Sequence, residues 1–570
     1  MTTQENYEAL KAGRSALRRY EGELGVAEPF TASLFSEEQR RALSREGLTR
    51  FEALACHSAR QALALAGIDV SRPNVVLILS TTKGNIELLG TGSPSASDIS
   101  PATAARHLAE ALGVTTAPLV VCNACISGVA AIILASRLLE AGAYDYAIVC
   151  GAEVQSTFTV SGFQSLKAVS EDACRPFDME RMGLNLGEAA ATMVLSREPF
   201  PGAWCIEAGA VRNDAFHISS PSKNGDGARA ALQAIGARAA IDDIAFINAH
   251  GTATMFNDQM ESVAIAQSGF GQIPVNALKG YYGHTLGAAG LLETVASMAA
   301  AADGVILATR GFEELGVSGR ISVSDENRPT DKRRFVKMIS GFGGGNAAIL
   351  CRREAGSSPA PSKRKGEREE TGVAVTVAHQ VRLTPQTLII DGRETETGCR
   401  LTDLYKRAVG DYPKYYKMDG LSRLGFLASE LLLQAEGRGA TTANREETVE
   451  DAAGRAVILF NHSSSVDADV KFQASIADPE NFFPSPSVFV YTLPNIVTGE
   501  IAIRNHYHGE TSFYVLPEPD EDLMRQIIEA SFLDSATRSM ITGWVDYVDE
   551  QHYEASLQLI CRQQEPESSE

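Results

Sequence analysis

The sequence predicts an α/β protein in which buried strands alternate with helices. Four short runs rich in β-branched apolar residues are expected to be buried strands: Val75–Leu79, Leu119–Cys122, Tyr146–Cys150 and Ile244–Asn248. Two longer stretches have helical length and pattern: Gly128–Ala141, which Gly142 is expected to end, and Gly287–Ala302. Strands that alternate with helices predict a layered α/β fold whose strands are mainly buried.

The chain is long enough for more than one domain. It has 570 residues, of which 44% are hydrophobic and 21% charged, ordinary values for a globular protein with a large core. A single hydrophobic core rarely serves so many residues, so we expect two or more domains.

Charge and cysteine content exclude several classes of protein. Lys and Arg number 51 against 71 Asp and Glu, a formal net charge of −20. This balance argues against non-specific nucleic-acid binding and against attachment to an anionic membrane surface, since both need a basic face. The nine cysteines are odd in number and scattered, so they indicate a reducing compartment and not a disulfide framework.

The sequence shows neither a signal peptide nor a membrane span. The N-terminal stretch MTTQENYEALKAGRSALRRYEGEL is polar and charged, without the apolar core of a signal peptide. The longest apolar stretches, such as Gly128–Leu139, are too short to cross a bilayer. We therefore expect a soluble, cytoplasmic protein.

One segment separates two parts of the chain. Residues 353–372, which include EAGSSPAPSKRKGEREETG, are rich in Ser, Pro, Gly and charge and have almost no bulky apolar residues. Such a composition buries too little surface to offset its ordering entropy. We therefore predict a disordered linker between a domain at 1–352 and a domain at 373–570.

The two parts carry matching patterns. Gly47–Arg50 (GLTR) and Gly420–Arg423 (GLSR) each precede a helical pattern and then an apolar strand. Further on, Val149–Gly151 is matched by Ile541–Gly543. Repetition over this length predicts a duplicated half-domain and not a short solenoid repeat.

The second copy lacks the residues that could carry chemistry in the first. Counting back equal distances from Gly151 and Gly543 aligns Cys125 with Pro517. The second copy also ends before any segment like those around His250 and His284. It is therefore not expected to run the same reaction.

The segment Val121–Gly128 (VCNACISG) offers a candidate nucleophile. A strand is expected to end near Cys122 and a helix to begin just after Cys125. The positive end of a helix dipole and its unpaired N–H groups favour a thiolate. The alternative is one more buried, inert thiol. Cys122 and Cys125 also form a C-x-x-C, but no second ligand pair stands at zinc-site spacing, and a redox dithiol has no further support.

Three further segments carry polar or glycine-rich motifs at the ends of expected strands or helices. His250 lies in NAHGTAT, where a strand turns into a Gly/Thr-rich loop, followed by NDQME. His284 lies in KGYYGHTLGAAG, ahead of a helix made of small residues. Ser340–Asn346 (SGFGGGN) supplies unobstructed backbone N–H groups, as an oxyanion-binding turn requires. Alone, each histidine is better explained by a structural role and the glycine run by a tight turn.

Together, the four segments resemble the β-ketoacyl-acyl-carrier-protein synthase family, within the thiolase-like superfold. A further family-like block is RPFDMERMGLNLGEAAA, Arg175–Ala191. Order and spacing both match, and the resemblance covers roughly residues 1–352. It implies a thiolase-like layered αβαβα fold for the first part and a partial thiolase-like α/β domain at the C-terminus.

The resemblance also implies roles for individual residues. Cys125 would take an acyl group from a carrier thioester. His250 and His284 would stabilise the enolate that forms when a malonyl thioester loses carbon dioxide. The backbone N–H groups of Cys125 and Phe342 would form an oxyanion hole, and Phe342 would gate access to the thiol. Neutral donors aimed at a developing oxyanion suit this chemistry without a metal.

The implied reaction is a decarboxylative Claisen condensation in fatty-acid, polyketide or polyene-type biosynthesis. Lys279 and Glu293 would order the site around the histidines. No cofactor is implied beyond the pantetheine carried by the acyl carrier protein. The implied partners are that carrier and a second subunit, in a homodimer or a heteromer with another ketosynthase.

Two departures from the family pattern stand out. The family's hydrophobic first strand is missing ahead of Tyr7–Ser15, so either the chain is shortened or another segment supplies that strand. Val373–Val377 could equally be the lost first strand of the second copy.

The second part resembles the N-terminal half of an inactive chain-length factor. Ser485–Ile503 resembles the family's segment ahead of the nucleophile, and Pro517 then offers neither a thiol nor an N–H. This part would either pair with an active synthase surface and shape the acyl tunnel, or merely cover hydrophobic surface.

Other functions remain open at this point. A chain-priming decarboxylase would not need the acyl-transfer role of Cys125. A thiolase is disfavoured because its acid–base cysteine would stand where this chain has SGFGGG. The non-enzymatic alternative is a carrier-binding or chain-length-factor-like partner of another synthase. The basic run Lys363–Lys365 is either a solvated stretch of linker or a contact for an acidic carrier.

Overall fold

The computed structural model describes residues 2–90, 92, 95–199, 202–354, 373–398, 400–437, 449–478, 480 and 482–563. The predicted linker lies outside these residues except at its start. Arg353 ends strand β15 (Gly345–Arg353), and Glu354 donates a backbone hydrogen bond to Ala203. The first part therefore extends two residues past its predicted boundary.

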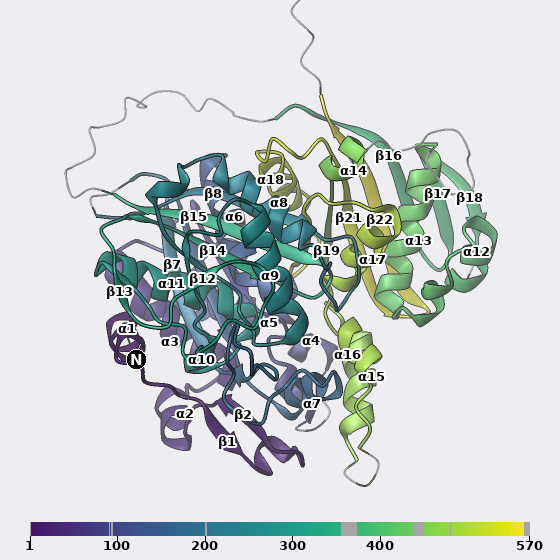
Figure 1. Ribbon diagram of the computed structural model, residues 1–570. Helices are drawn as coiled ribbons and strands as arrows, with labels where there is room; N and C mark the ends of the chain where they lie inside the picture. The colour runs from purple at the N-terminus through teal and green to yellow at the C-terminus, as the bar shows by residue number, and fades with distance from the viewer. Residues whose placement is uncertain are drawn as a thin grey trace, which may run out of the picture.

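Two mixed sheets form the frame of the first part (Figure 1). One sheet has six strands in the order β12-β10-β9-β14-β15-β8. In that order they span Ser322–Val323, Pro274–Asn276, Ile244–Asn248, Arg334–Ser340, Gly345–Arg353 and Trp204–Asn213. The first part also contributes four neighbouring strands to an eleven-stranded sheet: β4 (Leu119–Val121), β3 (Val75–Ser80), β5 (Tyr146–Glu153) and β7 (Ala189–Ser196). All four strands predicted from apolar runs are present.

Helices lie between the two sheets and on their outer faces. The pair between the sheets is α6 (Ser127–Glu140) and α11 (Ala289–Ala302). The outer face of the large sheet is covered by α3 (Arg50–Ala66) and α5 (Pro101–Leu112). The outer face of the six-stranded sheet is covered by α8 (Asp226–Gly236), with α9 (Met255–Gln267) beside it. This is the predicted αβαβα order. The second predicted helix begins slightly late, because Leu286–Ala288 forms a 3₁₀ turn ahead of α11.

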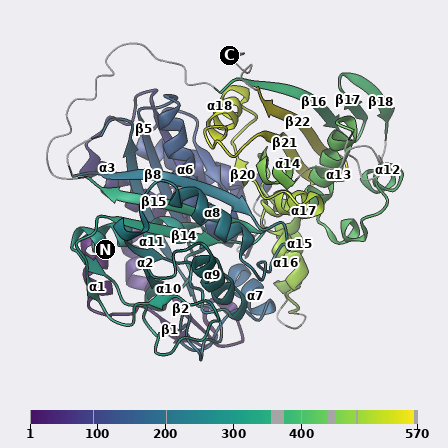
Figure 2. The same cartoon turned by 45° about the horizontal axis from the view of Figure 1, so that its top comes forward.

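The second part continues the large sheet of the first. Strand β4, the outermost of the first part's four strands in this sheet, pairs antiparallel with β20 (Thr511–Val515), and the order then runs β19-β21-β22-β16-β17-β18. These strands span Arg455–Asn461, Ser539–Asp549, His552–Arg562, Val375–Leu383, Thr387–Ile390 and Arg393–Thr397. Three helices accompany them: α13 (Gly420–Ala435) and α17 (Ile496–Asn505) on one face, and α18 (Glu521–Ser531), which packs on α6 (Figure 2). The two parts therefore share one sheet.

Shorter elements surround this frame. They are α1 (Thr3–Lys11), β1 (Arg18–Tyr20), β2 (Phe30–Ser33), α2 (Glu37–Leu43), α4 (Ala96–Ile99), α7 (Thr157–Ser165), β6 (Leu186–Gly187), α10 (Lys279–Tyr282), β11 (Val305–Ile306), β13 (Arg328–Pro329), α12 (Leu401–Ala408), α14 (Val449–Gly454), α15 (Val466–Ile476) and α16 (Pro486–Tyr491).

Strand pairing repeats between the two parts. In the first part Ser80 of β3 pairs with Val121 of β4 and with Gly151 of β5. In the second part Leu459 of β19 holds the same place, since it pairs with Phe513 of β20 and with Gly543 of β21. The spacing from Val121 to Gly151 equals that from Phe513 to Gly543, so the sheet register agrees with the alignment of Cys125 with Pro517.

The sheets show where the first strand of each α/β unit pairs. β8 pairs with β15 in the six-stranded sheet, and β16 pairs with β22 in the second part. Strand β7 is the counterpart of β15 and β22. Among the described strands, β7 pairs with β5 alone and has no such first strand on its other side. β16 begins at Val375, so the apolar run expected at Val373–Val377 forms the start of that first strand in the second copy.

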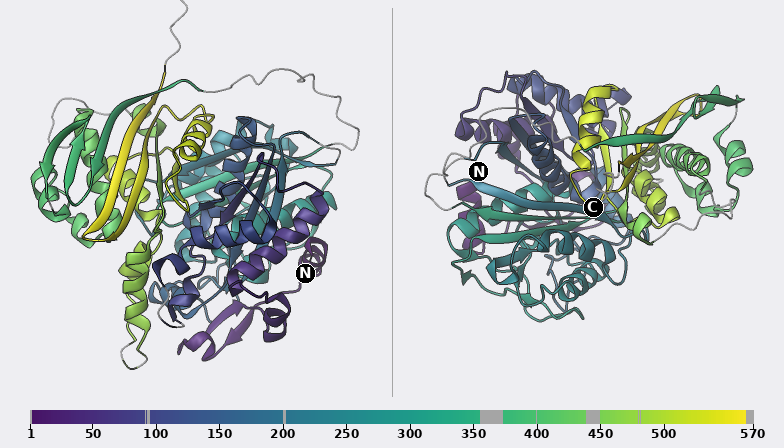
Figure 3. Two further views of the ribbon diagram at one scale, coloured as in Figure 1. Left: turned by 180° about the vertical axis from the view of Figure 1, so that it is seen from behind. Right: turned by 90° about the horizontal axis from the view of Figure 1, so that it is seen from above.

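In the second part, the outer strands of the sheet have one buried face and one face that is partly exposed to solvent. In β22, Tyr553, Ala555, Leu557 and Leu559 are buried on the side of α13, whereas the alternating residues Glu554, Ser556 and Gln558 are half-exposed on the other. Antiparallel strands tolerate this arrangement. The outer strands, seen from behind in Figure 3, therefore need no second sheet to cover them.

Two bulk properties concern cysteines and membranes. No disulfide joins any two of the eight cysteines in the described segments. Within the described ranges, every helix is too short or too polar to cross a bilayer.

Candidate active site

Cys125 sits at a sharp turn between a strand and a helix. β4 ends at Val121, a 3₁₀ turn spans Ala124–Ile126, and α6 starts at Ser127. Ala124 adopts a φ of +47°, a left-handed conformation that costs free energy for a residue with a Cβ. The turn places the thiol at the N-terminal end of α6, as the sequence predicted.

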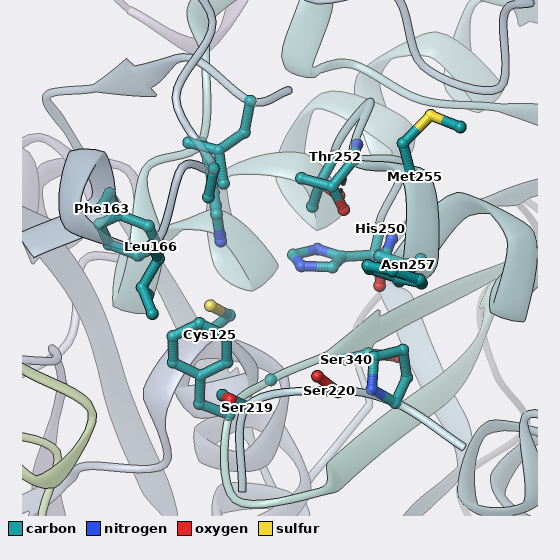
Figure 4. A pocket seen from close by; sticks show the side chains of 18 of the residues that line it. Cys125, Phe163, Leu166, Ser219, Ser220, His250, Thr252, Met255, Asn257 and Ser340 are labelled. Atoms are coloured by element: carbon teal, nitrogen blue, oxygen red, sulfur yellow. Dashed lines mark hydrogen bonds between the residues drawn. The ribbon is translucent and has the colours of Figure 1, made fainter. Parts of the chain in front are cut away.

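The structure brings together the three residues predicted to carry the chemistry. The Sγ of Cys125 and one ring nitrogen each of His250 and His284 all lie within 4.8 Å of one another. The two imidazoles are buried, with ring centroids 4.9 Å apart and planes at 80°. Figure 4 shows the Cys125 sulfur and the His250 ring facing one space. That space is a cavity of about 350 Å³.

Both histidines are held in the neutral form. Burial lowers the pKa of His250 and of His284 well below 6.5, and the ammonium of Lys279 adds to the effect. The Leu286 N–H donates to Nδ1 of His284 at 3.2 Å, so the proton of this ring resides on Nε2. That Nε2 has no partner in the described part of the chain. His284 therefore presents an unused N–H donor.

Burial, not the helix dipole, dominates the chemistry of the resting thiol. The pKa of Cys125 is raised to about 12, chiefly by desolvation, with Lys279 opposing the shift. The backbone N–H of Cys125 at the start of α6 lowers this pKa, in the expected direction, but burial outweighs that effect in the unliganded site. The thiol is protonated at neutral pH and has to lose its proton as it reacts.

The loop that carries His250 is fixed through its backbone. The carboxylate of Glu261 accepts hydrogen bonds from the N–H groups of His250 and Gly251, each at 2.7 Å. Asp258 accepts from the N–H of Thr252 at 2.9 Å. The carboxylates of the NDQME motif therefore act as anchors for the histidine loop, and they do not point into the cavity as acids or bases.

A buried charge network lies behind the histidines. Lys279 Nζ donates to the carbonyl of His250 at 2.6 Å and to Glu293 at 2.7 Å. Lys337 Nζ donates to the same Glu293 carboxylate and to the carbonyl of Ala249. Lys337 was not predicted, although a lysine inside the apolar strand RFVKMIS is itself a signal. Burial lowers the pKa of Lys337 to about 8.

The late glycine turn passes beside the nucleophile. A Cβ on Gly341 would lie 3.2 Å from the Cys125 nitrogen, so a side chain there would crowd that N–H. The Phe342 N–H donates to no group in the described segments. The ring of Phe342 lines the cavity and stacks on Phe163, with centroids 6.2 Å apart. This geometry suits both predicted roles of Phe342, in the oxyanion hole and as a gate.

Residues of the second part also reach the site, and sequence reasoning missed them. Phe489 and Leu493 line a small cavity of about 20 Å³ behind Cys125. Nearby, Lys83 forms a buried ion pair with Asp469 at 2.5 Å. Partners separated by more than 300 residues carry no signal in a single sequence.

A metal ion bound at this cluster would compete with the chemistry predicted for its three residues. Within the described ranges, Cys125, His250 and His284 form the one cluster of Cys, His and carboxylate side chains compact enough to hold an ion. An ion there would occupy the nucleophile and both imidazoles, and none would remain free to react.

Comparison with known proteins shows where this chain has relatives. Residues 2–199 match the model of the Beta-ketoacyl synthase, N-terminal domain, and residues 204–313 match the model of the Beta-ketoacyl synthase, C-terminal domain. Nodulation protein E of Rhizobium leguminosarum bv. trifolii is 30% identical over 344 residues, which are 54% of this chain and 83% of that protein. The 3-oxoacyl-[acyl-carrier-protein] synthase 2 of Vibrio cholerae is 29% identical over 333 residues, 51% of this chain and 80% of that protein.

Two solved structures of ketosynthases with a chain length factor are similar to this chain. A ketosynthase (ApeO) in complex with its chain length factor (ApeC) from Xenorhabdus doucetiae is 26% identical, with a TM-score of 0.53, and the match covers 62% of this chain and 94% of that one. A PfaC keto synthase–chain length factor is 14% identical, with a TM-score of 0.72, over 99% of this chain and 77% of that one. At that identity the second likeness concerns the fold alone.

Proposed function

This chain belongs to the β-ketoacyl synthase family, and from that premise we propose that it condenses an acyl thioester with malonyl-acyl-carrier protein. The products are a β-ketoacyl thioester on the carrier and carbon dioxide. The observation that supports this proposal best is the convergence of the Cys125 thiol with two buried, neutral imidazoles on one cavity.

The first half-reaction transfers the acyl group to Cys125. Its sulfur attacks the thioester carbonyl, the carbon–sulfur bond to the carrier's pantetheine breaks, and the thiol proton ends on the departing sulfur. The N–H groups of Cys125 and Phe342 are placed to stabilise the oxyanion of the tetrahedral intermediate. Because the thiol pKa is high, proton loss and attack are coupled.

The second half-reaction forms the carbon–carbon bond. Malonyl thioester loses carbon dioxide, and the negative charge moves to its thioester oxygen as an enolate. Neutral His250 and His284 donate hydrogen bonds to that oxygen. The enolate carbon then attacks the acyl group on Cys125, and the released thiolate takes up one proton.

The charge network behind the histidines supports this step. Lys279 and Lys337 hold the carbonyls of His250 and Ala249, and Glu293 balances both ammonium groups. Their positive charge also opposes protonation of the imidazoles. In this proposal Lys279, Lys337 and Glu293 position the histidines and do not touch the substrate.

The proposed reaction sets the partners and surroundings of the protein. It needs an acyl carrier protein with its pantetheine and no other cofactor. The second part takes the place of a chain-length-factor half, joined to the synthase by a shared sheet. We place the reaction in the cytoplasm, since a reducing compartment suits eight cysteines that form no disulfide with one another.

Intact-protein mass and carbon dioxide release test the proposal together. The purified protein is incubated with acyl-carriers of different length and with malonyl-carrier, and Cys125→Ala is treated in parallel. We expect acylation at Cys125 and condensation that the variant loses. Carbon dioxide release without acylation would identify a priming decarboxylase, and the absence of both reactions would favour the non-catalytic carrier-binding alternative.

A further inference from the structure

We infer that the second part holds in place the glycine turn Ser340–Asn346 of the first part, called the oxyanion turn below because it carries the Phe342 N–H. The second part does so through Asn495 and Gly499 at the start of α17. This inference rests on the proposed function, because it assigns a task in the acyl-transfer step to a part of the chain that supplies no reacting group. Asn495 is a positioning residue, since it binds the backbone of Phe342 and not the reacting atoms.

The first contact is a hydrogen bond across the boundary between the two parts. Asn495 Nδ2 donates to the carbonyl oxygen of Phe342 at 2.8 Å. Its side chain is buried, so water cannot easily replace the bond. The bond fixes the peptide plane that follows Phe342 and, through it, the orientation of the turn.

The second contact is a close fit between two glycines. A Cβ on Gly499 would lie 2.6 Å from the carbonyl oxygen of Gly343 and 2.9 Å from its Cα. Gly343 has a φ of +88° and Gly344 of +76°, conformations that L side chains rarely adopt. A turn built from such residues has little stiffness of its own, so neighbouring groups have to define its place.

The second part also anchors the neighbouring loop. Asn213 Nδ2 donates to the carbonyl of Gly343 at 2.8 Å and to Thr511 Oγ1 at 2.9 Å. The Gly343 N–H donates to the carbonyl of Ile218 at 2.7 Å, which ties this loop to the turn. Both segments that frame the cavity beside Cys125 are therefore bound to each other and to the second part.

The nucleophile turn has an anchor of the same kind. The Phe513 N–H of β20 donates to Oδ1 of Asn123 at 2.6 Å, two residues before Cys125. The histidines differ, because their anchors, Glu261, Lys279 and Glu293, all lie in the first part. The second part therefore contacts the two turns that would serve acyl transfer, and it does not supply the anchors of the histidines that would serve decarboxylation.

This asymmetry gives a test that a merely structural role would not pass. Asn495→Ala removes the donor, Asn495→Asp keeps the shape but replaces the donor with an acceptor, and Gly499→Ala inserts a methyl group against Gly343. We expect each to slow acylation of Cys125 by about 10- to 100-fold, because a displaced oxyanion donor costs roughly that much. Decarboxylation of malonyl thioester should stay within about threefold of wild type, since the histidine anchors are unchanged.

Asn505→Ala is the matched control on the same helix. The amide of Asn505 donates to the carbonyl of Ile501 within α17 and, at 3.5 Å, to Glu430, both away from the turn, and its loss should leave both half-reactions unchanged. Hydrogen–deuterium exchange of residues 340–346 gives a readout independent of activity. Exchange should rise in the Asn495 and Gly499 variants and not in Asn505→Ala.

The outcomes separate this inference from the proposed function. Variants that acylate within twofold of wild type, or that lose both half-reactions equally without faster exchange at 340–346, would overturn the inference. If the wild-type protein neither acylates nor decarboxylates, the proposed function fails. The exchange experiment then decides alone whether the second part holds the turn.

Discussion

At the scale of single residues, desolvation sets the properties of the site. His250 and His284 are buried and Cys125 is half-buried, and desolvation favours the neutral form of each. The site therefore holds a thiol and two imidazoles at neutral pH, without a thiolate–imidazolium pair. Such an arrangement leaves the imidazoles free to donate hydrogen bonds to an enolate.

This state predicts how Cys125 responds to pH. A thiol with a pKa of about 12 has a thiolate fraction that rises tenfold per pH unit throughout the neutral range. The rate of alkylation of Cys125 by iodoacetamide should therefore increase with a slope near one from pH 7 to pH 9, without a plateau. Peptide mass spectrometry of the labelled protein measures it, with Cys205 and Cys561 as internal comparisons.

A plateau beginning near pH 7 would contradict this prediction. It would show that His250 or His284 takes the thiol proton in the resting enzyme. Repeating the titration with His250→Asn would identify that partner.

At the scale of elements, buried ion pairs join the helices and strands of the two parts. Arg137 of α6 binds Glu510, ahead of β20, at 2.6 Å. Arg212 of β8 binds Asp534 at 2.6 Å, and Arg137 also approaches Asp534. These side chains are about nine-tenths buried, so the pairs are screened little by water or salt.

Removal of one partner from this network should destabilise the protein strongly. Glu510→Leu leaves the buried guanidinium of Arg137 with only Asp534, which lies 3.7 Å away and is shared with Arg212, a loss of about 3–5 kcal/mol in the free energy of unfolding. Urea unfolding followed by circular dichroism measures the change. Arg525→Leu, which breaks an exposed pair with Asp522, should cost less than about 1 kcal/mol. Equal effects of the two variants would show that the buried pairs do not join the parts.

At the scale of the whole molecule, the second part completes the first. Strand β4 leads into the nucleophile turn, and its side that faces away from β3 pairs with β20 of the second part. The face around Phe158 and Phe163 packs on Phe472 and Phe489 of the second part. The interpretation of the second part as an appendage that only covers hydrophobic surface does not account for its contacts with the oxyanion turn.

The first part should therefore not function alone. Residues 1–354 expressed without the rest expose the edge of β4 and the aromatic face, which favours aggregation. We expect little soluble protein and no acylation of Cys125, and recovery of both when residues 373–570 are co-expressed. Size-exclusion chromatography and intact mass check this. A soluble, fully active 1–354 fragment would refute it.

The sequence by itself predicted the α/β layering, four buried strands and two helices of the first part, and the motifs that carry Cys125, His250, His284, Lys279 and Phe342. It did so because those features are local. Buried parallel strands are continuous apolar runs, and the motifs around Cys125, His250, His284 and Phe342 keep their order and spacing along the chain.

Tertiary structure alone decided the rest, because it depends on contacts between distant segments. The burial of the site raised the pKa of the Cys125 thiol and outweighed the opposite effect of the helix N-terminus. The pairing of β4 with β20 joined the two parts into one sheet. The reach of Asn495 to Phe342 spans 153 residues of sequence, and no periodicity or motif records such a pairing.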